Sequence, residues 1–289
     1  MIAGLSAKLA MIVKPLNKDG ALGAQIAGLD LTRPIARAEF AAVDAAFREH
    51  LVLVFRGAPL DPNQFVAFSR NFGALQPHVT KRYRHPEHPE IVYMTNVKPD
   101  GSYDRAGAQR GAQAWHSDLS YDVVPAKCTL LHPLALPDRG GNTKFADMYA
   151  AFETMPAALR DRIAGLRAEF RYGGRHGYSV EVLSEAARNR PSVVHPMVRV
   201  HPDTGRRAVF ANPYHTVGIR GMARAQSDAL LDEVFAWCAQ PQFQWEHRWR
   251  LGDTIVWENR AAWHQGPRDY PTDQKRVFLR TTVRGTPTH

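Results

Sequence analysis

The spacing of apolar side chains along this chain predicts five helices. Residues 38–50 carry apolar side chains at a helical period. Residues 61–72 predict a second helix, with Asp61 as its N-cap and Pro62 at its first position. Two short helices are predicted over residues 148–152 and 156–165, and residues 222–239 show the clearest amphipathic pattern.

Short apolar or alternating runs that end at turn residues predict strands. These runs cover residues 11–15, 20–31, 51–55, 91–95, 126–135, 142–146, 166–172, 193–200, 206–212, 243–249, 254–258, 262–264 and 277–283. We expect the runs 193–200 and 206–212 to form a hairpin, because a His-Pro-Asp-Thr-Gly turn joins them.

The order of these elements predicts a mainly β fold with flanking helices. There is no regular alternation of strand, helix and strand, so an antiparallel sandwich or jelly roll is favoured. No repeat or linker divides the chain, and we expect one domain over residues 1–289. Two irregular segments, 76–114 and 173–190, are either lid or substrate loops or ordinary exposed loops.

Composition narrows the class of partner. A hydrophobic content of 44% and a charged content of 22% are typical of a globular chain, and neither a membrane span nor a signal peptide is apparent. The net charge of +9 points to anionic partners, but the basic residues are dispersed, which favours a small anionic substrate over nucleic acid. Only Cys128 and Cys238 are present, which fits buried free thiols in a reducing cytoplasm.

His116 and Asp118 lie two residues apart in the segment Trp-His-Ser-Asp-Leu-Ser-Tyr. On a strand, alternate side chains point to the same face, so both could reach one ion. They would supply two thirds of a two-histidine, one-carboxylate iron site, and His264 is the candidate for the third ligand. The alternative is a chance pair, either on the surface or hydrogen-bonded.

Two arginines lie four residues apart on the last predicted strand. Residues 276, 278 and 280 share one face, so Arg276, Phe278 and Arg280 would point together. Guanidinium groups that face the interior require anionic partners. The alternative is a polar face of the sheet turned to water.

Together these motifs resemble the taurine/2,4-dichlorophenoxyacetate dioxygenase family of iron(II)- and 2-oxoglutarate-dependent enzymes. The resemblance rests on His-Ser-Asp, then Gly-Gly-Asn-Thr ending 25 residues later (143 − 118 = 25), then a distant histidine and Arg-x-x-x-Arg, and it runs from about residue 23 to 285. It implies a double-stranded β-helix, which is a cupin-like jelly roll.

The resemblance also implies roles for individual residues. His116, Asp118 and His264 would bind Fe(II), and Thr143 and Arg276 would hold 2-oxoglutarate. Arg280, His78 and the backbone N–H of Leu119 would bind the anionic group of the substrate. Glu258 or Asn259 could accept a hydrogen bond from a ligating histidine, but a turn residue is the favoured interpretation.

The taurine pattern fails at three substrate positions, which hold Lys81, Ala112 and His215. Lys81 would repel a primary amine, so taurine itself is disfavoured. Tyr121 and His215 either line the pocket or pack in the core. The expected reaction uses O2 to hydroxylate a C–H of an aryloxyalkanoate, or of an alkyl or aryl sulfonate or sulfate. Succinate and CO2 are released, and the product then collapses.

Other classes of function remain open at this point. A catalytically silent jelly-roll protein that binds an organic acid is the main alternative, and oxygen-dependent succinate release would separate it from an enzyme. A nucleic-acid-associated protein and a zinc hydrolase are weaker alternatives. We also expect a homo-oligomer, either a dimer or a tetramer.

Overall fold

The computed structural model describes residues 11–17, 22–77, 83–98, 100–103, 114–175 and 189–288. Within them, a large sheet has the strand order β1–β2–β3–β13–β5–β15–β4. Its strands are Ile12–Pro15, Ala24–Ala27, Val52–Arg56, Asp253–Glu258, Ala126–Ala135, Val277–Arg284 and Val92–Thr95, in that order. The neighbouring strands run antiparallel except β2 and β3, which are parallel.

Three smaller sheets complete the β structure. One has the order β12–β6–β14, the second β11–β7–β8, and the third pairs β10 with β9. Their strands are β6 (Thr143–Asp147), β7 (Arg167–Phe170), β8 (Val193–Pro196), β9 (Val198–Val200), β10 (Arg207–Val209), β11 (Thr216–Ile219), β12 (Gln244–His247) and β14 (Ala262–Gln265). The prediction of a mainly β chain with flanking helices is therefore confirmed.

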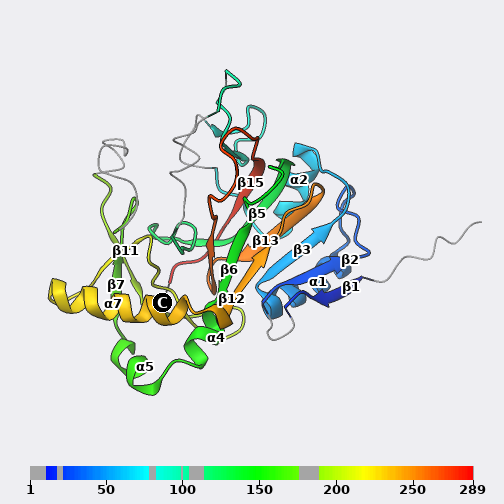
Figure 1. The fold of residues 1–289 in the computed structure, drawn as a ribbon. Helices are drawn as coiled ribbons and strands as arrows, with labels where there is room; N and C mark the ends of the chain where they lie inside the picture. Colours follow the sequence, from blue (N-terminus) through cyan, green and yellow to red (C-terminus); the bar gives the residue numbers. More distant parts are fainter. Residues whose placement is uncertain are drawn as a thin grey trace, which may run out of the picture.

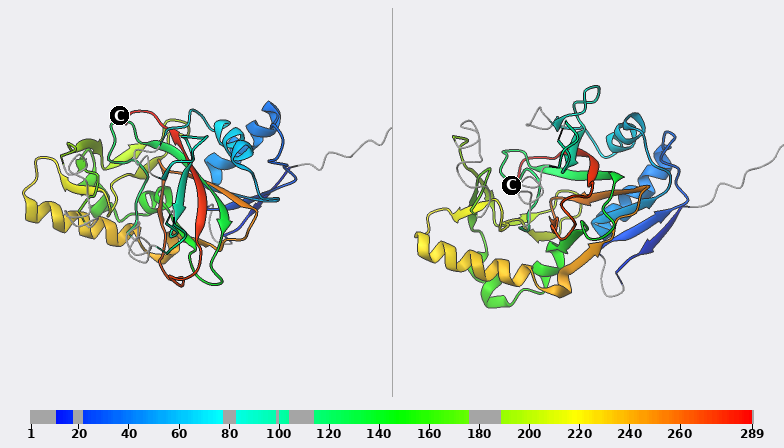
Figure 2. Two further views of the ribbon diagram at one scale, coloured as in Figure 1. Left: turned by 90° about the horizontal axis from the view of Figure 1, so that it is seen from above. Right: turned by 45° about the horizontal axis from the view of Figure 1, so that its top comes forward.

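The helices lie at opposite ends of the molecule, as Figures 1 and 2 show. They are α1 (Arg37–His50), α2 (Pro62–Arg70), α4 (Met148–Glu153), α5 (Ala157–Ile163) and α7 (Arg224–Cys238), and a 3-10 turn covers Pro241–Phe243. Helices α1 and α2 cover the outer face of the large sheet, while α4, α5 and α7 lie on the far side (Figure 1). Asp61 caps α2 by accepting a hydrogen bond from the N–H of Gln64, as predicted.

Alternation along the strands divides the core into two layers. In β13, Ile255 and Trp257 pack into the interior between the sheets, while Val256 packs toward α1 and α2. In β15, Phe278 points inward and Leu279 points to the helices. The inner face of β15 therefore borders the interior between the sheets, where the candidate site lies.

In the second half of the chain, one prediction is wrong in detail and one strand was missed. The run 193–200 is not one hairpin strand, because β8 pairs with β7 and only β9 pairs with β10. The chain changes partner at the fully buried Met197, whose N–H donates to the carbonyl of Leu166 and whose carbonyl accepts from Phe210. Strand β11 was not predicted; its register shifts between Thr216 and Gly218, which hides the alternation.

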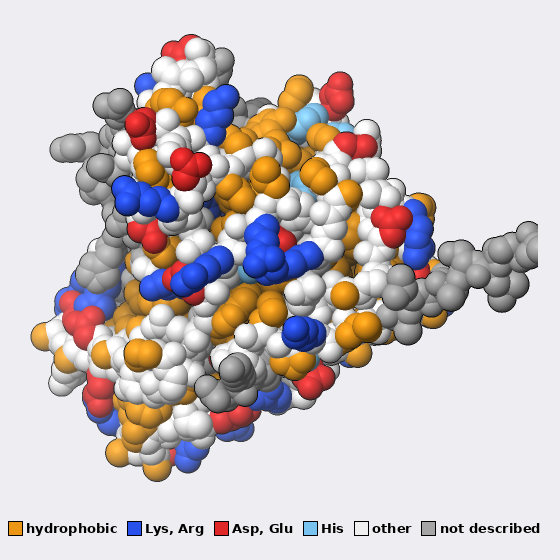
Figure 3. Space-filling view, turned by 45° about the vertical axis from the view of Figure 1, so that its right-hand side comes forward, with side chains coloured by type: hydrophobic (Ala, Val, Ile, Leu, Met, Phe, Trp, Pro, Cys, Tyr) orange, Lys and Arg blue, Asp and Glu red, His pale blue; other side chains and the backbone are white. Residues whose placement is uncertain are grey.

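The surface carries charge of both signs. On the face in Figure 3, basic side chains lie among acidic and apolar ones. Both cysteines are buried free thiols, as predicted. In the part of the chain that the structure describes, no helix is both long and apolar enough to cross a membrane.

Candidate metal centre and active site

The three predicted metal ligands meet in the interior. His116, Asp118 and His264 each offer a ligand atom, and these atoms lie within 4.8 Å of one another. His116 and His264 are held together by two backbone hydrogen bonds, in which His116 N–H donates to His264 O over 3.1 Å and His264 N–H donates to His116 O over 2.9 Å. All three side chains are buried.

The local geometry differs from the predicted one. His116 forms an isolated bridge to His264, and the chain turns at residues 118–120, so the motif does not lie on a continuous strand. Leu119 adopts a left-handed backbone conformation with φ of 54°. Asp118 therefore reaches the ion site because the chain turns there, and the argument from alternating strand residues was wrong.

Both imidazoles are neutral. Burial lowers the pKa of His116, although Asp118 partly opposes this effect. Burial and the neighbouring His116 hold the pKa of His264 well below its ordinary value. The Nδ1 of His116 lies 3.1 Å from the carbonyl of Ala114, and its Nε2 lies on the side of Asp118, 3.8 Å from Oδ1. A neutral ring that donates from Nδ1 keeps its Nε2 lone pair free for a metal.

Asp118 is ionised and fixed. Burial opposes ionisation, but the charge of Arg280 and the hydrogen bond from Thr129 help to hold the pKa of Asp118 below its ordinary value. Nη2 of Arg280 lies 2.7 Å from Oδ1. Oδ2 accepts a hydrogen bond of 2.6 Å from the hydroxyl of Thr129.

Asn259 completes the support of Asp118. Its Oδ1 accepts from the Asp118 N–H over 3.2 Å and from the Trp257 indole over 3.0 Å, while its Nδ2 donates to Thr129 Oγ1 over 2.9 Å. Asn259 lies in the turn after β13, as expected, and within the described residues neither ligating histidine donates to it; its contact with the backbone of Asp118 was not predicted. Glu258 instead pairs with Arg260, away from the ligands.

Thr143 is the first residue of β6, and Arg276 directly precedes β15. The Nε of Arg276 donates to the carbonyl of Gly141 over 3.0 Å, and its guanidinium lies over the ring of Phe278 at 4.4 Å. Burial lowers the pKa of Arg276 to about 10. None of the described carboxylates forms an ion pair with it. Gly141 has a φ of 66°, and a Cβ there would lie 3.0 Å from Arg276 Nε, so this turn requires glycine.

Both arginines thus point into the interior with Phe278, as predicted, and the alternative of a solvated polar face is wrong. The side chain of Arg280 is only 13% exposed. Its Nε is buried without a hydrogen-bond acceptor among the residues that the structure covers.

Comparison with known proteins agrees with this geometry. The model of the family described as "Taurine catabolism dioxygenase TauD, TfdA family" matches residues 13–282. The chain belongs to the TauD/TfdA dioxygenase family. A 2,4-dichlorophenoxyacetate dioxygenase of Burkholderia sp. (strain RASC) is 35% identical over 271 residues, which cover 90% of this chain and 91% of that protein.

Solved structures of TauD/TfdA-type enzymes share the fold. A taurine dioxygenase from Burkholderia xenovorans has a TM-score of 0.80 at 29% identity, with 96% of this chain and 90% of that chain covered. The enzyme AAD-2, solved with Mn(II) and N-oxalylglycine, has a TM-score of 0.79 at 28% identity, with 97% and 100% covered. The predicted jelly roll and the predicted enzyme class are therefore confirmed: the chain is an Fe(II)- and 2-oxoglutarate-dependent dioxygenase that uses O2.

The residues present fit the cofactor of the TauD/TfdA family. Two neutral imidazoles and one ionised carboxylate converge in a buried space, which is the donor set that iron(II) oxygenases use. The guanidinium of Arg276, which lacks a carboxylate partner among the described residues, fits a dicarboxylic co-substrate.

Aromatic side chains form one wall beside the three candidate metal ligands. Tyr121 packs edge-on against His215 at 4.7 Å and against Tyr172 at 4.9 Å. His215 packs against Tyr214 at 4.5 Å, and Tyr214 lies 5.6 Å from His116. The structure thus brings Tyr121 and His215 to the site. His78, Lys81 and Ala112 lie outside the described residues, as do residues 78–82, 99 and 104–113 of the first predicted loop and residues 176–188 of the second.

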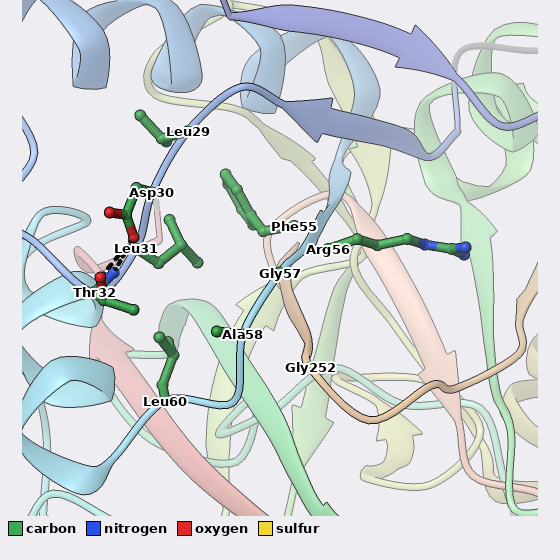
Figure 4. Close-up of a pocket in the computed structure, with 10 residues that line it drawn as sticks. All are labelled: Leu29, Asp30, Leu31, Thr32, Phe55, Arg56, Gly57, Ala58, Leu60 and Gly252. Atoms are coloured by element: carbon green, nitrogen blue, oxygen red, sulfur yellow. Dashed lines mark hydrogen bonds between the residues drawn. The ribbon is translucent and has the colours of Figure 1, made fainter. Parts of the chain in front are cut away.

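A second hollow carries none of this chemistry. The pocket in Figure 4 lies between the loop after β2, the end of β3 and the turn at Gly252. None of the three candidate metal ligands lines it. Its one acidic side chain, Asp30, is occupied by two hydrogen bonds from Thr32.

Proposed function

We propose that His116, Asp118 and His264 hold the Fe(II) of this dioxygenase. The support is their mutual distance of no more than 4.8 Å, the neutrality of both rings and the ionised carboxylate. When bound, the iron with 2-oxoglutarate and O2 supplies the oxidation that inserts oxygen into a C–H bond and releases succinate and CO2. The chain itself fixes the ligands and keeps the site largely free of bulk water.

Thr143 and Arg276 are proposed to hold the distal carboxylate of 2-oxoglutarate. Arg276 offers a fork of N–H donors that no described carboxylate uses, and forks of this kind bind carboxylates in a bidentate manner. Thr143 is 4% exposed and adds a hydroxyl from the facing sheet. Their assignment also follows from the family resemblance.

The substrate is proposed to be a small organic anion. The observation that carries this proposal is Arg280, a mostly buried cation beside the metal cluster with an Nε that has no acceptor among the described residues. Leu119 adds a backbone N–H that donates to no acceptor in the described part of the chain, turned by its left-handed conformation. His78 and Lys81 would join them from the segment that the structure leaves undescribed.

Among such anions, an aryloxyalkanoate is the first candidate. The relative from Burkholderia sp. carries the name of a 2,4-dichlorophenoxyacetate dioxygenase, and the wall of Tyr121 and His215 suits an aromatic ring. Hydroxylation of the carbon next to the ether oxygen would give a hemiacetal, which falls apart to a phenol and an oxo acid. Alkyl or aryl sulfonates and sulfates are the second candidates.

An anaerobic screen with Fe(II) and 2-oxoglutarate tests this function. Phenoxyacetate, phenoxypropionate, an alkyl sulfate and taurine would each be added while the metal-to-ligand absorption band is recorded. Air would then be admitted and succinate measured. We expect a shift and coupled succinate release with an aryloxyalkanoate and little response to taurine. Coupling to taurine alone, or to uncharged aryl ethers, would contradict the proposal.

The domain, oligomeric state, location and partners of the chain complete the proposal. We propose a single domain over residues 1–289 with its catalytic core at about 23–285, acting as a dimer or tetramer in the cytoplasm without nucleic-acid or membrane partners. The mixture of charges on the face in Figure 3 supports the absence of a nucleic-acid partner, and the two buried free thiols fit a reducing cytoplasm. Light scattering after gel filtration tests the oligomer, and salt-sensitive binding to random DNA would contradict the absence of a nucleic-acid partner.

A further inference from the structure

The hydroxyl of Thr143 forms a hydrogen bond with a tryptophan side chain, Trp249, to which the proposed function assigns no role. The indole Nε1 of Trp249 lies 3.0 Å from Thr143 Oγ1, across 106 residues of sequence. Trp249 lies two residues after β12, whose last residue, His247, pairs with Thr143 of β6, so the contact forms at the end of this strand pair. Thr143 is the first residue of β6.

The direction of this hydrogen bond is fixed by chemistry. An indole N–H can only donate, so the Thr143 oxygen must accept. The hydroxyl hydrogen of Thr143 is then left to donate elsewhere, and the described residues offer it no acceptor. A carboxylate can only accept, so it is the partner that this arrangement favours.

The same indole also contacts the support of Arg276. Trp249 packs edge-on against Phe278 with ring centroids 4.7 Å apart, and the Arg276 guanidinium lies 4.4 Å from the centre of that Phe278 ring. Trp249 also packs edge-on against His247, with ring centroids 4.8 Å apart. Trp249 thus contacts both the hydroxyl of Thr143 and the Phe278 ring that packs against Arg276.

We propose that Trp249 is a positioning residue for the co-substrate, which sets Thr143 as a hydrogen-bond donor toward the distal carboxylate of 2-oxoglutarate. This inference rests on the proposed role of Thr143. It predicts that the effect of Trp249 on co-substrate affinity passes through the Thr143 hydroxyl. A tryptophan that only fills space would act independently of that hydroxyl.

A double-mutant cycle on the Zn(II)-loaded full-length chain tests this inference. The probe is N-oxalylglycine, and its dissociation constant is measured by calorimetry for wild type, Trp249→Phe, Thr143→Val and the double variant. Trp245→Phe is the matched control, because Trp245 lies on β12 and its indole N–H has no acceptor among the described residues. Thr143→Ser keeps the hydroxyl and serves as the conservative variant.

We expect Thr143→Val to weaken binding about 10-fold or more and Trp249→Phe about 3- to 10-fold. In the Thr143→Val background, Trp249→Phe should change binding by less than about twofold, since the hydroxyl it acts on is gone. Trp245→Phe should stay near wild type, and Thr143→Ser, which keeps the hydroxyl, should restore most of the binding that Thr143→Val loses. In the active Fe(II) enzyme, Trp249→Phe should raise the KM for 2-oxoglutarate more than it lowers kcat.

A second measurement covers the case in which Trp249→Phe does not fold. The 15N-labelled indole resonance of Trp249 should move when N-oxalylglycine binds to the Zn(II) protein, and this movement should be lost in Thr143→Val. Absence of any movement in the wild-type chain would overturn the inference.

The other outcomes distinguish a failure of the role proposed for Trp249 from a failure of the role proposed for Thr143. If Thr143→Val weakens binding but Trp249→Phe does not, the inference fails and the role of Thr143 stands. If Trp249→Phe weakens binding equally in both backgrounds, Trp249 acts by packing and the inference is overturned. If Thr143→Val binds the probe like wild type, the proposed role of Thr143 is wrong, and the inference falls with it.

Discussion

Arg280 Nη2 lies 2.7 Å from Oδ1 of Asp118, so the proposed substrate-binding cation is in direct contact with a proposed metal ligand. This ion pair connects the proposed substrate-binding region with the proposed metal site. Arg280 stabilises the ionised form of Asp118. Its Nε is buried and has no acceptor within the described residues, so the guanidinium keeps a donor for an anion beside the metal.

Arg280→Gln is therefore expected to impair the use of the organic anion far more than the use of 2-oxoglutarate. Removing one charge from a buried pairing costs about 2–5 kcal/mol, so kcat/KM for the anion should fall at least about 30-fold. Arg284→Gln is the matched control, because Arg284 ends the same strand and is exposed. Steady-state succinate assays measure both. An unchanged KM for the anion in Arg280→Gln would show that another cation binds it.

Thr129→Val tests the support of the metal-binding carboxylate. Valine has a similar shape, but the variant removes the 2.6 Å hydrogen bond to Asp118 Oδ2 and the acceptor of Asn259 Nδ2. Loss of a hydrogen bond to a metal ligand typically lowers metal affinity about 10- to 100-fold. Titration of the metal-free chain with Mn(II) or Zn(II) measures the metal dissociation constant of each variant.

Thr281→Val is the control for that experiment. Thr281 is also a fully buried threonine, but its hydroxyl pairs with Ser69 on the helix side of the large sheet. It should lose some stability and keep its metal affinity. Equal metal affinities in the Thr129 and Thr281 variants would mean that the Thr129 bond does not hold the ligand in place.

Arg276→Ala distinguishes the roles of the two inward arginines. Because Arg276 lies toward the Gly141 turn and Arg280 toward Asp118, we expect the 2-oxoglutarate requirement to rise at least about 10-fold, with a much smaller change for the organic anion. Lys275→Ala, at the exposed neighbouring position, should behave like wild type. The reverse pattern of KM changes would show that the two arginines have been exchanged in our assignment.

Much of the fold follows from local sequence. The strand Ala126–Ala135 has its predicted bounds, because its apolar run ends at clear turn residues. Helix α2 was predicted from the capping residue Asp61 and from Pro62. Strand β11 was missed because its pattern is short and broken by a register shift at Gly218.

The site was predictable only in part. The ligands and the arginines form ordered motifs that the family resemblance could locate, and the structure brings them together. Thr129 and Asn259 were not recognised as a unit because 130 residues separate them, and their hydrogen bond forms only once β5 lies beside β13. Trp249 and Thr143 likewise meet only through the pairing of β12 with β6. Contacts of this kind leave no periodic signal in a single sequence.

Glu258 gives the fold a dependence on pH that is separate from catalysis. It is 2% exposed and accepts hydrogen bonds from Arg260 over 2.6 and 2.7 Å, and His201 lies 3.3 Å from Oε2. Burial opposes its ionisation, but Arg260 outweighs this effect and holds the pKa of Glu258 below the ordinary value of 4.5. A carboxyl whose folded pKa is depressed stabilises the protein above its unfolded pKa, and this stabilisation is lost as the pH falls toward the folded pKa.

Glu258→Gln should therefore lower the free energy of unfolding at pH 7 by about 3–5 kcal/mol, because among the described residues it leaves Arg260 with only Asp203 as an ionic partner. The difference between wild type and variant should stay constant down to about pH 5 and shrink below the ordinary pKa of 4.5. Urea unfolding at pH 7, 5 and 4 measures it, and Glu246→Gln, at an exposed position on β12, is the control. A difference that is the same at pH 4 as at pH 7 would mean that Glu258 does not titrate with folding in this range.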